Sequence, residues 1–420
     1  MAAAGTRRAR MPLEDFVLAK LNTHGVGGTQ PFTIFRVPAY VRESNRTAYQ
    51  PRMVSIGPYY NGDAALRAME DHKWRYLHDL LNRNVQVTSS LLIQEMQSLE
   101  ARAFACYSER PELNSDDFVQ MLLLDGCFIL EFFFKWHTKK PDALCDVGWG
   151  TTLITTDLLL LENQIPFFII ERLYDVIAGA QGGRENLVTL LLEYIGDKEP
   201  IARPSGTEEI NHLLHLYYVS FMPQWSPHVP AFKEAETRVI PRATEMSEAG
   251  VTFVMRRSDH DMFAVKFDSG VMEIPVVEVD DMKRPLLVNL IAFEQSRGEE
   301  KPRVLTSYVA LMSMLARTKE DVELLRRHGI LVNLLANDEA AAQFFSHLGD
   351  GTAMSYDQQV FAGLYKDVQR YCDSWWPRNR ALLIRDYFGS PWSVISIIVA
   401  GLVVALTATQ TYFTVFPRQH

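Results

Sequence analysis

The C-terminal end of the chain is an uncharged, mostly apolar run. No Asp, Glu, Lys or Arg occurs between Tyr387 and Pro417. A helix needs about 20 predominantly apolar residues to cross a bilayer, because hydrocarbon tolerates no unpaired backbone groups. Residues 391–416 meet this length, so we expect them to form a transmembrane helix that contacts the lipid bilayer, followed by a short tail at 417–420.

Arginines flank this run unequally. Arg378, Arg380 and Arg385 precede it, whereas Arg418 alone follows it. Positive residues favour the cytosolic side of a membrane, and the N-terminus lacks the apolar region typical of a secretory signal peptide. The sequence therefore predicts a tail-anchored, single-pass protein with a cytosolic N-terminal body, located in the plasma membrane or an endomembrane.

Small residues recur at four-residue spacing within the expected span. The two pairs are Ser396 with Ala400 and Gly401 with Ala405. Such spacing lets two membrane helices approach closely and associate through packing. Two interpretations stay open: a homo- or heterodimer packed through the transmembrane helix, and a single span with ordinary small residues.

Composition limits the classes of partner and cofactor. The chain has 420 residues, is 47% hydrophobic and carries a formal net charge of −9. A binder of nucleic acid needs a basic face, so this charge argues against nucleic-acid partners. The four cysteines (Cys106, Cys127, Cys145 and Cys372) form no CxxC pair, which gives no zinc site. We expect no cofactor and no metal.

Hydrophobic periodicity predicts a mainly α (α+β) fold between a flexible N-terminal arm at 1–30 and the C-terminal helix. Apolar residues at three- and four-residue spacing indicate helices throughout residues 31–386, taken as one domain. The expected helices lie at about 63–81, 89–107, 114–133, 185–195, 208–219, 285–295, 304–316, 322–328, 338–348 and 356–375. Pro166 should end a further helix or kink it into the next one. Alternating apolar and polar residues predict one small antiparallel β-sheet at about 250–280.

Familiar catalytic signatures are absent from the sequence. It contains no GxSxG, Walker, HExxH, GxGxxG or protein-kinase motif. His212 and His215 would share one face of a helix, but no third or fourth metal ligand is identifiable near them. We therefore assign no catalytic, cofactor-binding or metal-binding residue.

Four polar residues interrupt otherwise apolar helices: Asp125, Asp157, Glu162 and Asn163. A buried carboxylate is costly unless it is paired or hydrogen-bonded. Its partner could be a basic residue, a backbone donor in the Tyr-rich turns of residues 32–62, or a ligand. The candidate basic residues are Arg36, Arg42, Arg52 and Arg75. Two interpretations stay open: a structural polar network that fixes helix register, and a ligand or catalytic pocket.

Several long strings resemble a plant family, the domain-of-unknown-function family 247. They are RVPAYVRESNRTAYQPRMVSIGPYYNG at 36–62, MEDHKWRYL at 69–77, FVQMLLLDGCFILEFF at 118–133 and DLLLLENQIPFFII at 157–170. One departure is Tyr60-Asn61, where the family has a histidine pair. The resemblance implies a plant single-pass membrane protein without an agreed activity. Some grass members are associated with self-incompatibility. No catalytic residue is carried over.

The leading expectation is a non-enzymatic, membrane-tethered recognition or scaffold protein with protein partners, acting in self-incompatibility or signalling. The alternative is a membrane-associated enzyme that uses Asp125, Asp157 and Glu162 in a cleft together with His72 or His212. A concave pocket at these carboxylates would favour the enzyme, and a packed interior would favour the scaffold.

Overall fold

The structure is a computed structural model, and it describes most of the chain. The described residues are 13–15, 17–18, 32–84, 86–144, 146–179, 182–195, 209–223, 239–257, 261–298, 302–351, 359–374 and 391–415. Most of the predicted N-terminal arm, the tail at 417–420 and the arginines that precede the uncharged run lie outside them. The described part is mainly helical with small sheets, which confirms the predicted predominance of helix.

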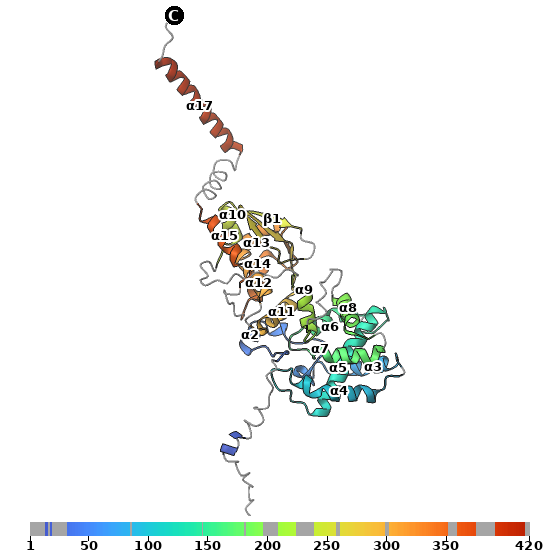
Figure 1. The fold of residues 1–420 in the computed structure, drawn as a ribbon. Coiled ribbons are helices and arrows are strands. Elements are labelled where there is room, and N and C mark those ends of the chain that lie inside the picture. The colour runs from blue at the N-terminus through green and yellow to red at the C-terminus, as the bar shows by residue number, and fades with distance from the viewer. Residues whose placement is uncertain are drawn as a thin grey trace, which may run out of the picture.

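An N-terminal lobe is built around one long buried helix, α5 (Figure 1). Asn114 caps α5 by accepting a 2.9 Å hydrogen bond from the amide of Asp117, and 16 of its 23 residues are buried. The buried residues lie between 118 and 135, and both ends of α5 are exposed. The lobe comprises α3 Ala68–Leu81, α4 Ser89–Phe104, α5 Ser115–His137, α6 Gly150–Leu158, α7 Phe167–Ala178 and α8 Arg184–Ile195.

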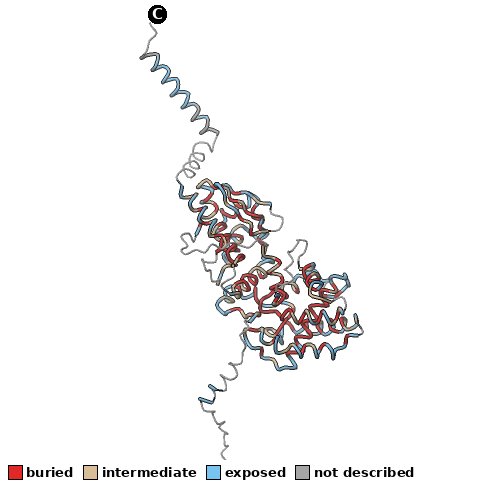
Figure 2. The backbone as a smooth tube through the Cα atoms, in the orientation of Figure 1, coloured by how far each residue is buried: buried red, intermediate tan, exposed pale blue. Residues whose placement is uncertain are grey.

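A C-terminal lobe has its own hydrophobic core, centred on the buried helix α12. Thr318 and Asp321 form a capping box at the start of α13. The helices of this lobe are α9 Leu213–Phe221, α10 Ala243–Glu248, α11 Arg284–Ser296, α12 Val304–Leu315, α13 Lys319–Arg327, α14 Asp338–Leu348 and α15 Ala362–Cys372. Figure 2 shows buried backbone running through both lobes.

The β structure differs from the single antiparallel sheet that the sequence predicts. Strand β3 (Val271–Pro275) pairs antiparallel with β2 (Lys266–Asp268), but its pairing with β1 (Thr252–Arg256) is parallel. A second sheet pairs β4 (Val277–Val279) with β5 (Leu331–Asn333), also in parallel. The prediction was wrong because alternation identifies a strand but not the direction of its neighbour.

The predicted transmembrane helix is also contradicted. Residues Pro391–Val415 form a helix, α17, on which Ser396, Ala400, Gly401 and Ala405 lie. Among the described residues, however, the structure contains no helix with the length and apolar character that a bilayer span requires. Thr407, Thr409 and Thr411 make the second half of α17 more polar than the first. The predictions of a single-pass anchor and of a membrane location with a cytosolic body are therefore wrong, whereas the predicted lipid contact stays a prediction.

The segment from Phe32 to Gly62, which we call the strap, lies against both lobes. It contains the short helix α2 (Ala39–Ser44) and two 3-10 turns, η1 (Arg46–Ala48) and η2 (Pro58–Tyr60), joined by extended backbone. Near its start Ile34 pairs with Tyr107 of the N-terminal lobe. Further along, the Asn45 side chain donates to the backbone oxygen of His347 in the C-terminal lobe.

Candidate functional site

The predicted polar residues gather where the strap crosses the N-terminal lobe, and Asp157 is at the centre. Asp157 is the second-last residue of α6, and its side chain is completely buried. Its carboxylate accepts hydrogen bonds from three successive strap amides, those of Arg52 (2.9 Å), Met53 (2.7 Å) and Val54 (2.8 Å). Burial raises the pKa of Asp157 to about 6, even though these amide donors favour the charged form.

Asn163 continues this pairing along the strap. Its side-chain oxygen accepts from the Ile56 amide at 2.7 Å, and its amide group donates to the Val54 oxygen at 3.0 Å. The same amide group donates to the backbone oxygen of Asp157 at 2.9 Å. One side chain thus satisfies strap backbone groups that would otherwise be buried without partners.

Asp125, on α5, binds the backbone of the next strap residue, Gly57. It accepts a 2.7 Å hydrogen bond from the Gly57 amide and forms a 2.7 Å ion pair with Lys73 of α3. Lys73 also pairs with Glu70 at 2.8 Å. Burial raises the pKa of Asp125 to about 6, while the charge of Lys73 opposes the rise. Two carboxylates therefore face one buried ammonium group.

Glu162 anchors the first and last parts of the strap at the same time. Its carboxylate accepts from the Val37 amide at 2.8 Å, from the guanidinium of Arg42, and from the hydroxyl of Tyr60 at 2.8 Å. Burial, followed by the charge of Glu162, raises the pKa of the Tyr60 hydroxyl. Tyr60 is therefore a neutral donor at physiological pH.

Asn289 ties the strap and the N-terminal lobe to the C-terminal lobe. This buried residue of α11 accepts from the Leu161 amide at 2.8 Å and donates to the Ala48 oxygen at 2.7 Å. Close by, Arg284 donates to the side-chain oxygen of Asn45 at 2.9 Å. We call these contacts, together with those of Asp125, Asp157, Glu162 and Asn163, the strap junction.

Of the four arginines that the sequence offered as partners, one has its side chain in the strap junction. Arg42 binds Glu162, whereas Arg52 contributes its amide to Asp157. Arg36 instead pairs with Glu109 at 3.7 Å, and Arg75 lies 4.0 Å from Asp142. Most of the other donors are backbone amides of the strap, which is the second kind of partner that the sequence allowed. The exceptions are the Lys73 ammonium on Asp125 and the Tyr60 hydroxyl on Glu162.

Lys73, like Asn289, Arg284 and Tyr60, is a site residue that sequence reasoning missed. A signal for it exists, because it lies four residues after Met69 and four before Leu77, on the buried face of α3. A lysine at such a position requires a buried carboxylate. Despite burial, the charge and hydrogen bond of Asp125 raise the pKa of Lys73.

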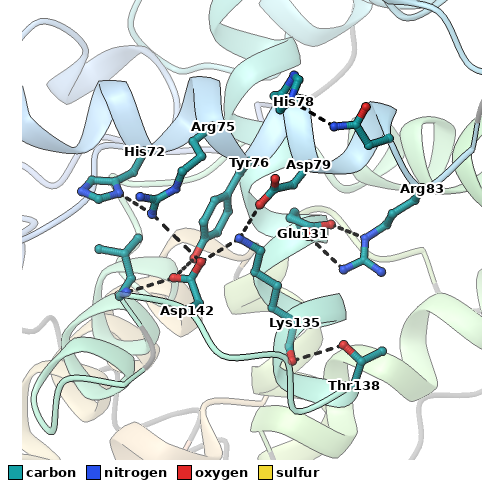
Figure 3. A network of polar contacts seen from close by, with 12 residues as sticks. His72, Arg75, Tyr76, His78, Asp79, Arg83, Glu131, Lys135, Thr138 and Asp142 are labelled. Atoms are coloured by element: carbon teal, nitrogen blue, oxygen red, sulfur yellow. Dashed lines mark hydrogen bonds and ion pairs between the residues drawn. The ribbon is translucent and has the colours of Figure 1, made fainter.

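A second polar network joins α3 to the end of α5 (Figure 3). Lys135 lies between Asp79 and Asp142, with an ion-pair distance of 2.7 Å to each. Tyr76 donates to Asp142 at 2.8 Å. Arg83 makes a two-pronged ion pair with Glu131, at 2.6 and 2.9 Å. This network accounts for two charged residues that interrupt the apolar sequence of α5.

The enzyme alternative pairs His72 or His212 with Asp125, Asp157 and Glu162. Among the described contacts, neither histidine touches any of these three acids. His212 is buried, its Nδ1 accepts from the His215 amide at 3.2 Å, and burial lowers its pKa to about 3. His72 lies on α3 beside Arg75, with Nδ1 2.6 Å from the guanidinium. Within the described ranges, no group of three or more potential ligands is placed to hold a metal ion.

The strap junction therefore defines a class of protein: a helical body whose buried acids bind its own N-terminal segment. A family profile described as plant protein of unknown function matches residues 34–406. The chain belongs to this family, domain-of-unknown-function family 247, which confirms the resemblance drawn from its motifs.

Two curated relatives come from Arabidopsis thaliana. The UPF0481 protein At3g47200 is 28% identical, with 91% of this chain and 86% of the relative covered. The putative UPF0481 protein At3g02645 is 23% identical, with 91% and 90% covered. No solved structure matches the chain.

Proposed function

We propose that this protein is a non-enzymatic recognition or scaffold protein, in which the strap joins two helical lobes into one binding body. One observation carries the proposal. Both carboxylate oxygens of Asp125, Asp157 and Glu162 are already engaged within the chain, by hydrogen-bond donors or, at Oδ1 of Asp125, by the ion pair with Lys73. A general base or nucleophile needs an oxygen that a substrate can reach. The arrangement supports a structural use of these acids.

The partners of such a body would be proteins. A part in self-incompatibility or signalling is a narrower prediction, which rests on the resemblance to grass members of the family. The family description itself gives no function. Proximity labelling in plant cells tests the broader proposal with the intact chain.

The variant for this experiment is Asp157→Ala, which removes the acceptor for three strap amides. Its control is Asp116→Ala, at an exposed position in the first turn of α5. We expect a reproducible partner set that the Asp157→Ala variant loses and the Asp116→Ala variant keeps. A labelled set no different from that of a diffusible labelling enzyme would refute the recognition role.

The enzyme alternative is tested by chemical labelling of carboxylates. A water-soluble carbodiimide with an amine nucleophile modifies accessible Asp and Glu side chains, and mass spectrometry locates the products. In the native chain we expect fast modification of the exposed Asp116 and none of Asp125, Asp157 or Glu162, which are at most 1% exposed. Rapid modification of any of these three would indicate a reachable cleft and favour the enzyme.

A further inference from the structure

Asn45 lies in the only N-glycosylation acceptor motif of the sequence. Such a motif has the form Asn-x-Ser/Thr with any residue but proline in the middle, and Asn45-Arg46-Thr47 meets it. No other asparagine of the chain is followed two residues later by serine or threonine. The sugar is attached to the side-chain nitrogen, Nδ2, so the surroundings of this atom decide whether the folded chain can carry it.

In the structure the Asn45 side chain binds the strap to the C-terminal lobe. Its Nδ2 donates to the backbone oxygen of His347, near the end of α14, at 3.1 Å. Its Oδ1 accepts from the guanidinium of Arg284, the first residue of α11, at 2.9 Å. Both ends of the amide group are thus engaged by the same lobe, and Asn45 is only 7% exposed.

The strap packs closely against this lobe on either side of Asn45. Ala48 and Tyr49 belong to the core of the C-terminal lobe, with exposed fractions of 6% and 2%. Before Asn45, the Cα atom of Val41 lies so near Gly351 that a Cβ atom added to this glycine would be 3.1 Å from it. A glycan is bulky and solubilising. An interface this close cannot contain one at Nδ2.

We propose that Asn45 accepts a glycan only before the strap docks, and that a glycan there prevents the strap from joining the two lobes. In the transfer, Nδ2 forms a bond to C1 of the sugar and loses one proton. The bond between C1 and the diphosphate of a lipid-linked oligosaccharide breaks, and the diphosphate leaves with the electron pair. Use of the acceptor and assembly of the body therefore exclude each other, whatever the role of the assembled body.

Import of the full chain into microsomes during translation tests this exclusion. A cleavable signal peptide directs the chain into the lumen, where the lipid-linked oligosaccharide of the microsomes is the sugar donor. After detergent release, a brief trypsin digestion removes chains whose strap is undocked, and mass spectrometry measures the glycan occupancy of Asn45. We expect occupancy in the trypsin-resistant chains to be about tenfold lower than in the total sample.

Two results of this experiment would overturn the proposal. One is equal occupancy of Asn45 in the resistant chains and in the total sample. The other is a parent chain that receives no glycan in microsomes that glycosylate a reference secretory protein.

Thr47 provides matched variants, because it completes the motif and is exposed. Thr47→Ala removes the acceptor motif and leaves Asn45 in place, whereas Thr47→Ser keeps the motif. The Thr47→Ala chain should stay unmodified in the lumen and yield more resistant body than the parent, and Thr47→Ser should behave like the parent. Equal yields for Thr47→Ala and the parent would mean that the glycan does not prevent assembly.

A second measurement starts from the folded, unmodified chain and needs no glycosylated chain to fold. Detergent-solubilised oligosaccharyltransferase and its lipid-linked donor are offered the full chain or a synthetic peptide of residues 43–49. We expect the peptide to be glycosylated and the folded chain to stay unmodified, because Nδ2 of Asn45 is engaged by His347. Modification of the folded chain at the rate of the peptide would contradict the exclusion.

Discussion

Gly57 combines a left-handed backbone with a close approach to another segment. Its φ is 77°, and a Cβ atom there would lie 2.2 Å from the backbone oxygen of Gln164. Gly57→Ala should therefore lower the free energy of unfolding by about 3 kcal/mol or more, since strain and displacement of buried backbone add. Urea denaturation measures the loss.

Gly62 provides a matched control for this substitution. Its φ is 81°, but no atom lies within 4 Å of the added Cβ. Gly62→Ala should cost only the strain of the left-handed conformation, about 1–2 kcal/mol. Equal losses at the two positions would mean that the close approach to Gln164 does not constrain the strap.

Lys73 neutralises a carboxylate that has no other cation among its described contacts. Lys73→Met leaves Asp125 buried without its ion pair, which should cost about 3–5 kcal/mol in unfolding free energy. Adding Asp125→Asn should recover part of this loss, because the amide oxygen can still accept from Gly57. An unimproved double variant would contradict the pairing. Lys283→Met breaks an exposed pair with Glu278 and should leave stability unchanged within error.

At the scale of elements, α5 ends in a hydrogen-bonding pattern that normally contains glycine. The Lys140 amide donates to the Lys135 oxygen and the Lys139 amide to the Trp136 oxygen, both at 3.0 Å. These two bonds define a Schellman motif, and Lys139 occupies its left-handed position with a φ of 50°.

Lys139→Gly should therefore raise the unfolding free energy by about 0.5–1 kcal/mol, because relief of strain exceeds the entropy that glycine loses on folding. Thermal unfolding measures the change. His137→Gly, at the last residue of α5, relieves no left-handed strain and should lower stability by up to about 1 kcal/mol. A destabilising Lys139→Gly variant would show that the side chain contributes more than the backbone strain costs.

Helices were predictable in this chain because their signals are local. The start of α5 and the end of α13 each lie one residue from the prediction. Pro166, in contrast, was expected to end or kink a helix, but it caps the start of α7, and the preceding helix already ends at Leu158. The partner of β4 was not predictable, since β5 has three residues and follows α13, about 50 residues later. A period of two cannot be recognised in so short a strand.

The strap junction was predictable in part. The cost of burying charge identified Asp125, Asp157, Glu162 and Asn163 as residues that need partners, and Arg42 as one candidate. Which partner each residue has depends on how the strap crosses α5 and α6, a non-local property that local patterns do not contain. The donating backbone amides, those of Arg52, Met53, Val54, Ile56 and Gly57, have no side-chain signature at all.

At the scale of the whole molecule, the buried acids predict how stability depends on pH. The pKa of Asp125 and of Asp157 rises from 3.8 to about 6 on folding, mainly through burial. At a pH between 3.8 and about 6, the native state binds protons at these two carboxylates that the unfolded state does not bind. The unfolding free energy should therefore increase as pH falls from 7 to 4, by up to about 3 kcal/mol for each group.

Below this window the trend should reverse. Burial alone would raise the pKa of Asp142, but hydrogen bonds from Lys135, the Leu144 amide and Tyr76 outweigh it and lower the pKa below 3.8. Its contribution is lost as pH falls through that lowered value. Chemical denaturation from pH 3 to 8 measures the profile, and Asp157→Asn should reduce the slope between pH 4 and 6. An unchanged slope would contradict the assignment to Asp157.

The central claim is that buried acids of the N-terminal lobe hold the strap in place through its backbone amides. Hydrogen exchange of the Met53, Val54, Ile56 and Gly57 amides, followed residue by residue in the intact chain, tests it most directly. The account predicts exchange as slow as that of the buried centre of α5, and marked acceleration of Met53 and Val54 in Asp157→Ala. Exchange of these four amides at the rate of an exposed loop would contradict it.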